Sequence, residues 1–452
     1  MRRWLTAPER HPGRTIAGIG VLFAIAFGAS LVYLPKPGGR IVLGDALHHY
    51  VQLRSAVFDH DLQFRNEYVR LYGLRGDEAE VEWVYQPTAT GHVRNLMPVG
   101  PALVWAPAFL IVTAGVWVAG LLGAAYPLDG YGRLFQATAG FSGIAAATAG
   151  SWFAYLAAAR LFERRAAIWA SLTVWLSSSA LYYSLVSPAY SHAASMLAVS
   201  AFWAAWILTL ERQHLARYGA IGLLAGFAAL VRWQDGVLLI VPAAEALWRL
   251  RSDGAKTAVA RMAVCTAGAL VAFLPQMAVW TVLYGTPLAI PQGEGFMKWG
   301  QPALVSMLFS DNHGLLSWTP IVALALVGFV PLTRRAPLVG LAAVLFFGIS
   351  LYVNAAVSDW WAGEAFGARR FVSCFPLFVL GVAALLDRAR AGTAAAAGFA
   401  AAFTIHTLLL LIQYQAFMHG LRNVVPYPRG FAGLWLARFR APFDLIAWWI
   451  GR

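Results

Sequence analysis

Apolar residues occur along the chain in many long runs, and basic residues mark the ends of these runs. Most runs approach the ~20 residues that a helix needs to cross hydrocarbon, although several are shorter. We predict eleven membrane-crossing helices, at 16–34, 134–160, 167–185, 189–210, 218–232, 236–249, 262–284, 317–333, 337–353, 370–387 and 393–417. The pair 218–232 and 236–249 is short enough to form a shallow hairpin. The pattern therefore predicts an all-α polytopic membrane protein.

Composition supports this prediction and excludes other classes. Hydrophobic residues make up 60% of the chain and charged residues only 12%, whereas a soluble protein has about a quarter charged residues. A soluble enzyme, a disordered chain and a fibrous protein are excluded. The net charge of +13 does not indicate nucleic-acid binding, because Lys and Arg do not form a stripe. Cys265 and Cys374 both lie in apolar runs, so no disulfide framework is expected.

The distribution of basic residues predicts the topology. The basic N-terminus should be cytoplasmic, and the first apolar run, from Ile16, should be a start-transfer anchor rather than a removed signal peptide. If the apolar stretch 98–124 crossed the membrane, most later basic loops would lie outside. If it makes no net crossing, they lie inside, as the positive-inside rule requires. Its Pro and Gly content also favours an interfacial or re-entrant helix.

This topology divides the chain into three parts. Residues 1–15 form a cytoplasmic N-terminus, 16–417 the transmembrane domain with a large external loop at 36–133, and 418–452 an external tail. The tail is rich in Trp, Phe and Arg, which predicts a helix lying at the membrane interface. Carboxylates concentrate in the external loops, which makes the external face the place to look for chemistry.

The first external loop carries a candidate general base. Asp45 precedes His48, His49 and Tyr50, and Asp45 and His49 would share one face of a helix. A carboxylate near imidazoles and a phenol at the membrane boundary is suited to accept a proton from a hydroxyl. Asp45 is also placed to cap the helix that follows, and both roles are compatible. A metal ion shared by the two histidines is not expected, because adjacent side chains diverge on a helix.

Further candidates lie in the external loops. Arg94 and Asn95 either bind substrate or anchor the following segment at the headgroups. Arg369 and Arg370 either anchor to headgroups or bind a phosphate bidentately, and two adjacent arginines at an external end run against the positive-inside trend. Arg232 either forms an ion pair with the nearby Asp235 or contacts a phosphate or headgroup.

Two external segments could line a pocket for a sugar. Asp311 and His313 precede an apolar run, where a neighbouring residue could equally cap the helix. Trp360, Trp361 and Glu364 combine aromatic faces with a carboxylate, which suits a sugar that stacks and hydrogen-bonds. An interfacial aromatic belt is the alternative for the tryptophans.

Five stretches together resemble a known superfamily. The segment after the first run reads GDALHHYVQLRSAVFDHDLQF, and it resembles the start of the GT-C fold glycosyltransferases, which include protein O-mannosyltransferases, aminoarabinose transferases and many bacterial enzymes. The other four stretches read NLMPVGPALVWAPAFL, LAGFAALVRWQDGVLLIVP, LFSDNHGLLSWTPIVALALVGF and WWAGEAFGARRFVSCFPLFVLGVAALL. The resemblance covers about 16–387. No single stretch is a strict signature. The resemblance is specific because the five stretches occur in the expected order along the chain and on the expected side of the membrane.

The resemblance implies a GT-C-like fold with juxtamembrane helices in the first external loop. It also implies a hexosyl- or pentosyltransferase that takes a sugar from a polyprenyl-phosphate donor and passes it to a glycan, lipid or protein acceptor, with Asp45 as catalytic base. The site would face the periplasm or exterior of a bacterial inner membrane. Many members have a further acidic residue in the next external loop, where this chain has His192. A divalent metal cofactor is therefore not supported.

The alternative function is a transporter or flippase of lipid-linked glycans. Transporters place ionisable residues near the bilayer midplane and often show internal repeats. Here the charges cluster at the external mouth and the halves show no repeat, which disfavours transport.

Overall fold

The computed structural model describes residues 6–34, 40–72 and 86–451. Residues 1–5 of the predicted cytoplasmic end and 36–39 of the predicted external loop therefore lie outside the described residues. The described chain is helical, and its only strand-like pairings are two isolated bridges, Pro87 with Val93 and Met297 with Val357. The all-α prediction is confirmed.

The helices follow one another along the whole chain. In order they are α2 (Ala7–Arg10), α3 (Pro12–Tyr33), α4 (Asp45–Phe58), α5 (Arg65–Tyr72), α7 (Gly100–Leu121), α8 (Arg133–Leu161), α9 (Arg164–Leu176), α10 (Ser179–Leu185), α11 (Ser191–Leu208), α12 (Leu215–Val231), η2 (Trp233–Leu239), α13 (Ile240–Trp248), α14 (Leu250–Asp253), α15 (Ala255–Tyr284), α16 (Leu304–Phe309), α17 (Leu315–Trp318), α18 (Ile321–Val327), α19 (Phe329–Arg335), α20 (Pro337–Ala355), η3 (Arg369–Cys374), α21 (Phe375–Arg388), α22 (Thr393–Met418), η4 (Ala432–Leu436) and α23 (Ala437–Ile450).

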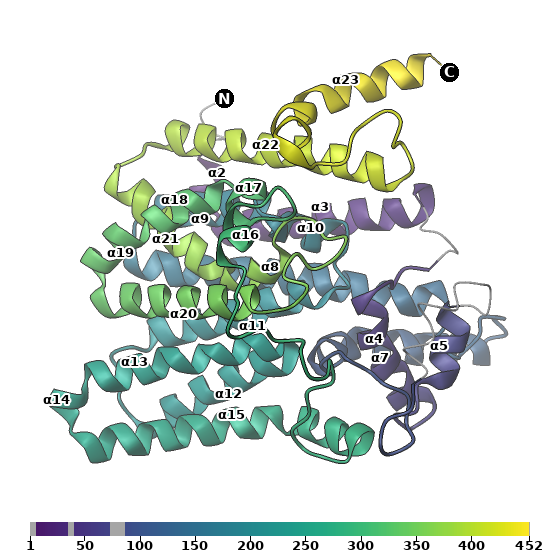
Figure 1. The fold of residues 1–452 in the computed structure, drawn as a ribbon, viewed down its shortest axis with the longest axis horizontal. Helices are drawn as coiled ribbons and strands as arrows, with labels where there is room; N and C mark the ends of the chain where they lie inside the picture. The colour runs from purple at the N-terminus through teal and green to yellow at the C-terminus, as the bar shows by residue number, and fades with distance from the viewer. Residues whose placement is uncertain (1–5, 35–39, 73–85, 452) are drawn as a thin grey trace.

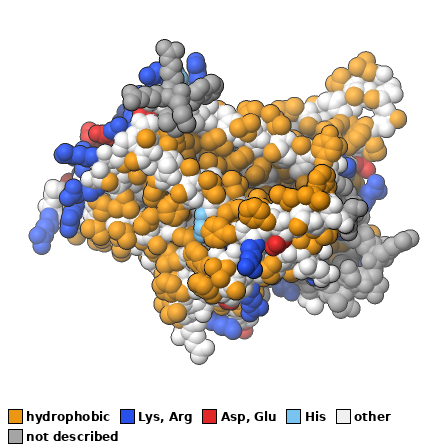
Figure 2. Space-filling view, turned by 90° about the horizontal axis from the view of Figure 1, so that it is seen from above, with side chains coloured by type: hydrophobic (Ala, Val, Ile, Leu, Met, Phe, Trp, Pro, Cys, Tyr) orange, Lys and Arg blue, Asp and Glu red, His pale blue; other side chains and the backbone are white. Residues whose placement is uncertain are grey.

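The long helices lie side by side along the longest axis of the molecule (Figure 1). The short helices α4 and α5 gather at the right-hand end of that view, and the turn at α14 marks the opposite end. Figure 2 shows a face covered largely by hydrophobic side chains, with Lys and Arg gathered at its left end. A broad apolar surface with charge at an end is what a protein embedded in lipid requires.

Seven of the described helices are long and apolar enough to cross a membrane: α3, α7, α11, α15, α20, the η3–α21 segment and α22. The shorter apolar helix α12 accompanies them. The structure is therefore that of a helical multi-pass membrane protein. The number of eleven crossings and their orientation stay predictions.

Several predicted spans are broken where local hydrogen bonding interrupts the helix. The span predicted at 167–185 is two helices, because the Ser178 hydroxyl accepts the Ala180 N–H and caps α10. The span predicted at 317–333 breaks at Pro320, between α17 and α18, since proline has no N–H to donate. The span predicted at 236–249 begins inside the 3-10 helix η2.

The stretch 98–124 forms one continuous helix, α7, and does not turn back on itself as a re-entrant segment would. Its first half lies beside α4 and the start of α8, because the Phe109 ring packs against those of Tyr50, Phe58 and Phe135. Its length and hydropathy would also allow a crossing. The position of 98–124 at the membrane interface therefore stays a prediction.

Small residues let α12 and α15 approach closely. A Cβ added to Gly222 would lie 1.9 Å from the Cys265 carbonyl oxygen, and one added to Gly226 would lie 2.1 Å from that of Ala269. This is the close backbone packing that a small-xxx-small pattern permits in membrane helices. It holds α12 rigidly, which matters because α12 ends at Arg232.

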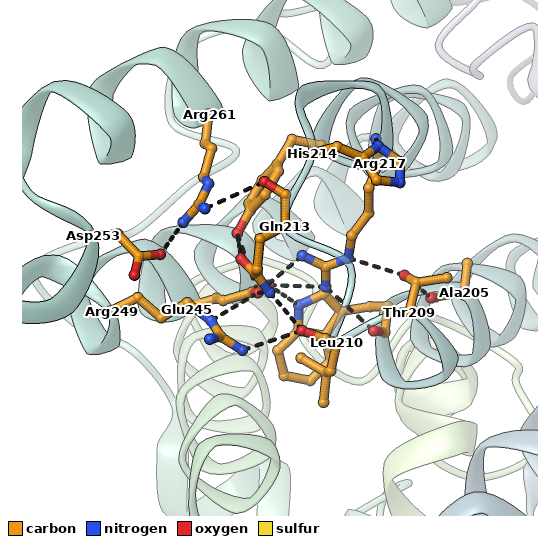
Figure 3. A network of polar contacts seen from close by, with 12 residues as sticks. Ala205, Thr209, Leu210, Gln213, His214, Arg217, Glu245, Arg249, Asp253 and Arg261 are labelled. Carbon is orange, nitrogen blue, oxygen red and sulfur yellow. Dashed lines mark hydrogen bonds and ion pairs between the residues drawn. The ribbon is translucent and has the colours of Figure 1, made fainter.

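A buried polar network joins α11, α12, α13 and α15 at the other end of α12 (Figure 3). The Glu245 carboxylate accepts from the Arg217 guanidinium at 2.9 and 3.0 Å and from the Trp206 indole at 2.7 Å. Both charged side chains are almost fully buried, so each requires the other. Arg217 and Arg232 stand at opposite ends of α12, about 22 Å apart by helical rise.

The tail contains the predicted helix. α23 packs beside α22 and exposes one apolar side, formed by Phe439, Phe443, Ile446, Trp449 and Ile450. The helix is confirmed, and its position at the membrane surface stays a prediction.

Cysteine-accessibility labelling tests the topology. We expect a cysteine placed at position 129, after α7, to react with an impermeant reagent from the external side, because 98–124 makes no net crossing. The native Cys265 and Cys374 are buried, so the background signal should be low. Labelling of position 129 only from the cytoplasmic side would show that α7 crosses the membrane and would reverse the side of every later loop.

Candidate active site

One polar cavity lies where the first loop meets the ends of several long helices. Its volume is about 220 Å³. Its wall combines residues from distant parts of the chain: Asp45, Leu96, Met97, Pro98, Ser191, His192, Arg232, Trp233, Gln234, Gln292, Phe296, Asp359, Arg369 and Arg370. Three arginines and two aspartates thus share one cavity, which is uncommon for a membrane protein unless the charges have a function.

Asp45 is held at the start of α4 by an unusual backbone turn. Gly44, the residue before it, has φ +54° and packs so closely to Tyr190 that an added Cβ would lie 2.8 Å from the hydroxyl oxygen. Glycine alone adopts such a conformation at low cost. The Asp45 side chain does not cap α4; the N-cap position belongs to Gly44, without a side-chain cap. The capping role considered for Asp45 is therefore wrong, and its carboxylate is available to the cavity.

Arg369 pairs with this carboxylate. Its Nη1 lies 2.9 Å from Asp45 Oδ2, and its guanidinium lies 5.6 Å from the centroid of the Tyr190 ring. Burial by itself would raise the pKa of Asp45, but the nearby positive charges, Arg369 first, outweigh burial and lower that pKa below its usual value. Asp45 is therefore ionised at neutral pH, and a third of its side chain remains exposed.

Arg370 is fixed by the loop before it. Its Nη2 donates to Asp359 Oδ1 at 2.8 Å, and its Nη1 donates to the carbonyl oxygens of Asp359 and Trp360 at 2.9 and 3.1 Å. These bonds orient the side chain while it still lines the cavity. The guanidinium is thus held in place by the protein before any ligand arrives.

The third arginine, Arg232, is less fully bonded. Its Nη1 lies 2.6 Å from His192 Nδ1, and its Nε is buried without a hydrogen-bond partner in the described structure. The neighbouring Trp233 Nε1 is unpaired in the same way. The considered ion pair with Asp235 is not the arrangement seen, because Asp235 accepts from the Ser195 hydroxyl at 2.5 Å. The Arg232 side chain itself lines the cavity, where its guanidinium charge favours an anionic ligand.

The residues that follow Asp45 are buried around α4 and do not line the cavity. His48 lies between two phenols, at 3.0 Å from Tyr68 and 2.9 Å from Tyr72. His49 Nδ1 lies 2.8 Å from the Pro98 carbonyl oxygen, and the Tyr50 hydroxyl donates to Gly130 O at 2.6 Å. All three predicted substrate ligands are buried, so the structure gives them a packing role around α4.

Burial lowers the pKa of both histidines to about 4, although the Asp45 charge opposes the shift in each case and the Pro98 bond opposes it in His49. Both rings are therefore neutral at neutral pH. The His49 ring donates from Nδ1 to the carbonyl, since a carbonyl oxygen only accepts.

Arg94 and Asn95 lie beside the cavity but outside its wall. Arg94 donates to Gln86 Oε1 at 3.1 Å and to Pro291 O at 2.8 Å. Asn95 donates to His48 O at 2.8 Å. These bonds tie the first loop together, and the next residues of the chain, Leu96 to Pro98, form the wall itself.

Two of the other predicted pocket residues, Asp311 and His313, contact the C-terminal segment instead. Asp311 accepts the Gly430 N–H at 2.8 Å, and His313 Nε2 lies 3.0 Å from the Tyr427 hydroxyl. Trp360 contributes its carbonyl to Arg370, while Trp361 and Glu364 are exposed. None of the five lines the cavity.

The cavity also contains residues that the sequence did not single out as binding residues. Trp233, Gln234, Gln292 and Phe296 carried no signal of their own, whereas a phosphate or headgroup contact was one of the two roles considered for Arg232. An arginine inside the apolar context LVRWQDG was the clearest available sign. Among the described residues, no group of three or more His, Cys, Asp and Glu side chains could hold a metal ion.

The fold and the cavity define a multi-pass helical membrane protein with a cation-rich site at one end of its long helices. No protein-family model matches the chain, and no curated protein matches it.

Among solved structures, the chain is similar to the archaeal oligosaccharyltransferase AglB from Archaeoglobus fulgidus, in complex with an inhibitory peptide and a dolichol-phosphate. The identity is 12% and the TM-score 0.48, over 97% of this chain and 54% of AglB. The chain thus spans about half the length of that protein. It is also similar to ArnT from Cupriavidus metallidurans bound to undecaprenyl phosphate, with 13% identity and a TM-score of 0.48 over 90% of this chain and 72% of ArnT. These identities and TM-scores are low, so a proposal about function has to rest on the cavity and not on the similarity to these proteins.

The buried histidines predict acid sensitivity. As pH falls below ~6.5 the unfolded chain binds protons at both histidines, while the folded protein stays neutral there until pH ~4. Their stabilising effect is therefore complete above pH ~6.5 and declines toward pH 4. We expect the melting temperature in detergent to fall over this window. His49→Asn, whose amide can still donate to Pro98 O, should make the decline shallower. An unchanged pH profile in this variant would contradict the assignment.

Proposed function

We propose that this protein is a membrane glycosyltransferase that moves a sugar from a polyprenyl-phosphate donor to an acceptor hydroxyl on the external face of the membrane. The single observation that carries this proposal is the meeting of Asp45 with Arg232, Arg369 and Arg370 in one cavity. A base and a set of phosphate-binding cations are the two parts that such a transfer needs.

The arginines support binding of the donor phosphate. Guanidinium groups bind phosphate oxygens bidentately, and three of them, on Arg232, Arg369 and Arg370, belong to side chains that line the same cavity. The phosphate is also the leaving group, so its negative charge grows as the glycosidic bond breaks. Preorganised cations stabilise that charge without a requirement for a metal ion.

Asp45 supports activation of the acceptor. A carboxylate whose pKa is lowered by Arg369 is a weak base while that pair is intact. A phosphate bound to Arg369 compensates the guanidinium charge, which raises the basicity of Asp45 when the donor is present. Donor binding thus prepares the base for the acceptor hydroxyl.

Asp45 and the arginines account for the proton and the charge that move during the transfer. The acceptor hydroxyl oxygen forms a bond to the anomeric carbon of the sugar, and its proton passes to Asp45. The bond from that carbon to the phosphate oxygen breaks, and the electron pair leaves with the polyprenyl phosphate, where the arginines neutralise it. Product release returns the proton from Asp45 to solvent.

The resemblance to GT-C glycosyltransferases supports the donor class and the placement of the site. It implies a reaction at the periplasmic or external face of a bacterial inner membrane, with a glycan, lipid or protein as acceptor. The site lies at the opposite end of α12 from the Arg217–Glu245 network, which is consistent with one catalytic and one cytoplasmic end.

Transport of a lipid-linked glycan remains the competing function. The cavity lies at the ends of helices such as α11 and α12, where residues 191, 192 and 232 line it, whereas a transporter binds substrate near the middle of the bilayer. Incubation of the purified protein with radiolabelled polyprenyl-phosphate sugars and candidate acceptors separates the two. Transfer of label to an acceptor supports the proposal, and movement of intact donor across vesicles without transfer contradicts it.

Replacement of Asp45 tests the base. Asp45→Asn keeps the size and an oxygen that can accept from Arg369, but it loses the proton-accepting charge. We expect turnover to fall by at least ~10²-fold, the lower range for loss of a general base, with the folded structure retained. Near wild-type transfer by this variant would remove Asp45 from the mechanism.

Graded replacement of Arg369 tests phosphate binding. Lys keeps the charge but loses the fork, and Gln loses both, so we expect Arg369→Lys to be milder than Arg369→Gln in both rate and donor affinity. Loss of a preorganised charged contact should cost about 2–4 kcal/mol of transition-state stabilisation. A headgroup anchor instead predicts lower stability with unchanged turnover per folded molecule. Specific activity and thermal stability measured on the same preparations distinguish these outcomes.

A further inference from the structure

The segment after α22 packs against the loop 310–314, which is hydrogen-bonded to the loop before the cavity arginines Arg369 and Arg370. We call residues 421–436 the C-terminal strap. Gly430 N–H donates to Asp311 Oδ2 at 2.8 Å, and Gln413 of α22 donates to the carbonyl oxygens of Pro426 and Gly433, both at 2.9 Å. The strap is thus fixed to α22 on one side and to the loop 310–314 on the other.

A line of hydrogen bonds runs from the strap toward the cavity. The Tyr427 hydroxyl lies 3.0 Å from His313 Nε2, and His313 Nδ1 lies 3.0 Å from the Trp361 carbonyl oxygen. Because a carbonyl oxygen only accepts, Nδ1 carries the proton and Nε2 accepts from the Tyr427 hydroxyl. One tautomer of His313 satisfies both bonds, so the phenol orients the ring that holds the loop.

The line ends at a cavity arginine. Arg370 Nη1 donates to the carbonyl oxygens of Asp359 and Trp360. These two residues directly precede Trp361, whose carbonyl oxygen contacts His313. Three consecutive carbonyl groups therefore connect His313 to Arg370. A shift of the loop at Trp361 would move the acceptors that orient the guanidinium.

The backbone at both ends of the His313–Trp361 bond is strained. His313 has φ 66° and Ala362, next to Trp361, has φ 61°. Such conformations are unfavourable for non-glycine residues, which keep them only where the surroundings impose them. The hydrogen bonds that link Tyr427, His313 and Trp361 can impose these conformations. Backbone strain of this kind accumulates near functional sites.

We propose that Tyr427 and His313 are positioning residues, which hold the loop 359–362 so that Arg370 is oriented toward the donor phosphate. This inference rests on the proposed function, since it assigns Arg370 to phosphate binding. The strap would then set donor affinity without touching the donor itself.

Removal of one hydroxyl isolates this role from folding. The Tyr427 ring packs against Phe417 at 5.1 Å and Tyr414 at 6.2 Å, so Tyr427→Phe keeps the packing and loses only the bond to His313. Tyr126→Phe is the matched control, because its hydroxyl accepts the Leu134 N–H at the start of α8 and makes no hydrogen bond to the cavity wall in the described part of the chain. Both variants should fold, with melting temperatures within a few degrees of the wild type.

The measurement is binding of undecaprenyl phosphate to the purified full chain in detergent. We expect Tyr427→Phe to weaken binding about 3- to 10-fold, the range for one hydrogen bond, and Tyr126→Phe to leave it unchanged. His313→Asn should be milder than His313→Ala, because Asn tolerates positive φ and can still donate to Trp361 O. Equal affinities of Tyr427→Phe and the wild type would overturn the inference.

A double-mutant cycle with Arg370→Gln shows whether the effect passes through Arg370. If it does, Tyr427→Phe adds no further loss in the Arg370→Gln background; an additive loss contradicts the positioning role. When Arg370→Gln weakens binding and Tyr427→Phe does not, the positioning role fails while the proposed function stands. A wild-type protein that does not bind undecaprenyl phosphate at all would overturn the donor assignment and the inference together.

Discussion

The ion pair between Asp45 and Arg369 is the interaction on which the arrangement of the site depends. It joins the start of α4 to the start of η3 across most of the chain, at 2.9 Å. Charges near a membrane core are costly unless each has a partner, so the pair fixes the first loop over the ends of the long helices. The same pair keeps the base ionised and its guanidinium in place.

The positive charge exceeds the negative charge on the cavity wall, and this excess gives the site its chemical character. Arg232 and Arg370 add two further guanidinium groups, while Asp359 supplies one more carboxylate. The carboxylates of Asp45 and Asp359 orient Arg369 and Arg370, while Arg232 contacts His192 instead of a carboxylate. A phosphate would compensate the excess charge, which is why the proposal assigns the cavity to a phosphate-linked donor.

Rigidity comes from outside the cavity. Close packing of Gly222 and Gly226 against α15 fixes α12, and the Glu245–Arg217 network fastens its far end. Arg232 follows the last residue of α12, beside the cavity, so the packing of α12 also fixes its backbone. On the other side, the strap holds the loop that orients Arg370. The site is thus defined by two supports that share no residue with it.

The sequence by itself determined the helical membrane fold and three of the charged groups of the cavity, Asp45, Arg369 and Arg370, because long apolar runs and charges at their ends are local signals. It also suggested His192. The tertiary structure alone decided which groups meet. His313 lies beside Tyr427, a residue 114 positions away, and Asp45 and its partner Arg369 are still further apart in the sequence. Side-chain contacts between remote segments depend on how helices pack, and hydropathy does not encode that packing.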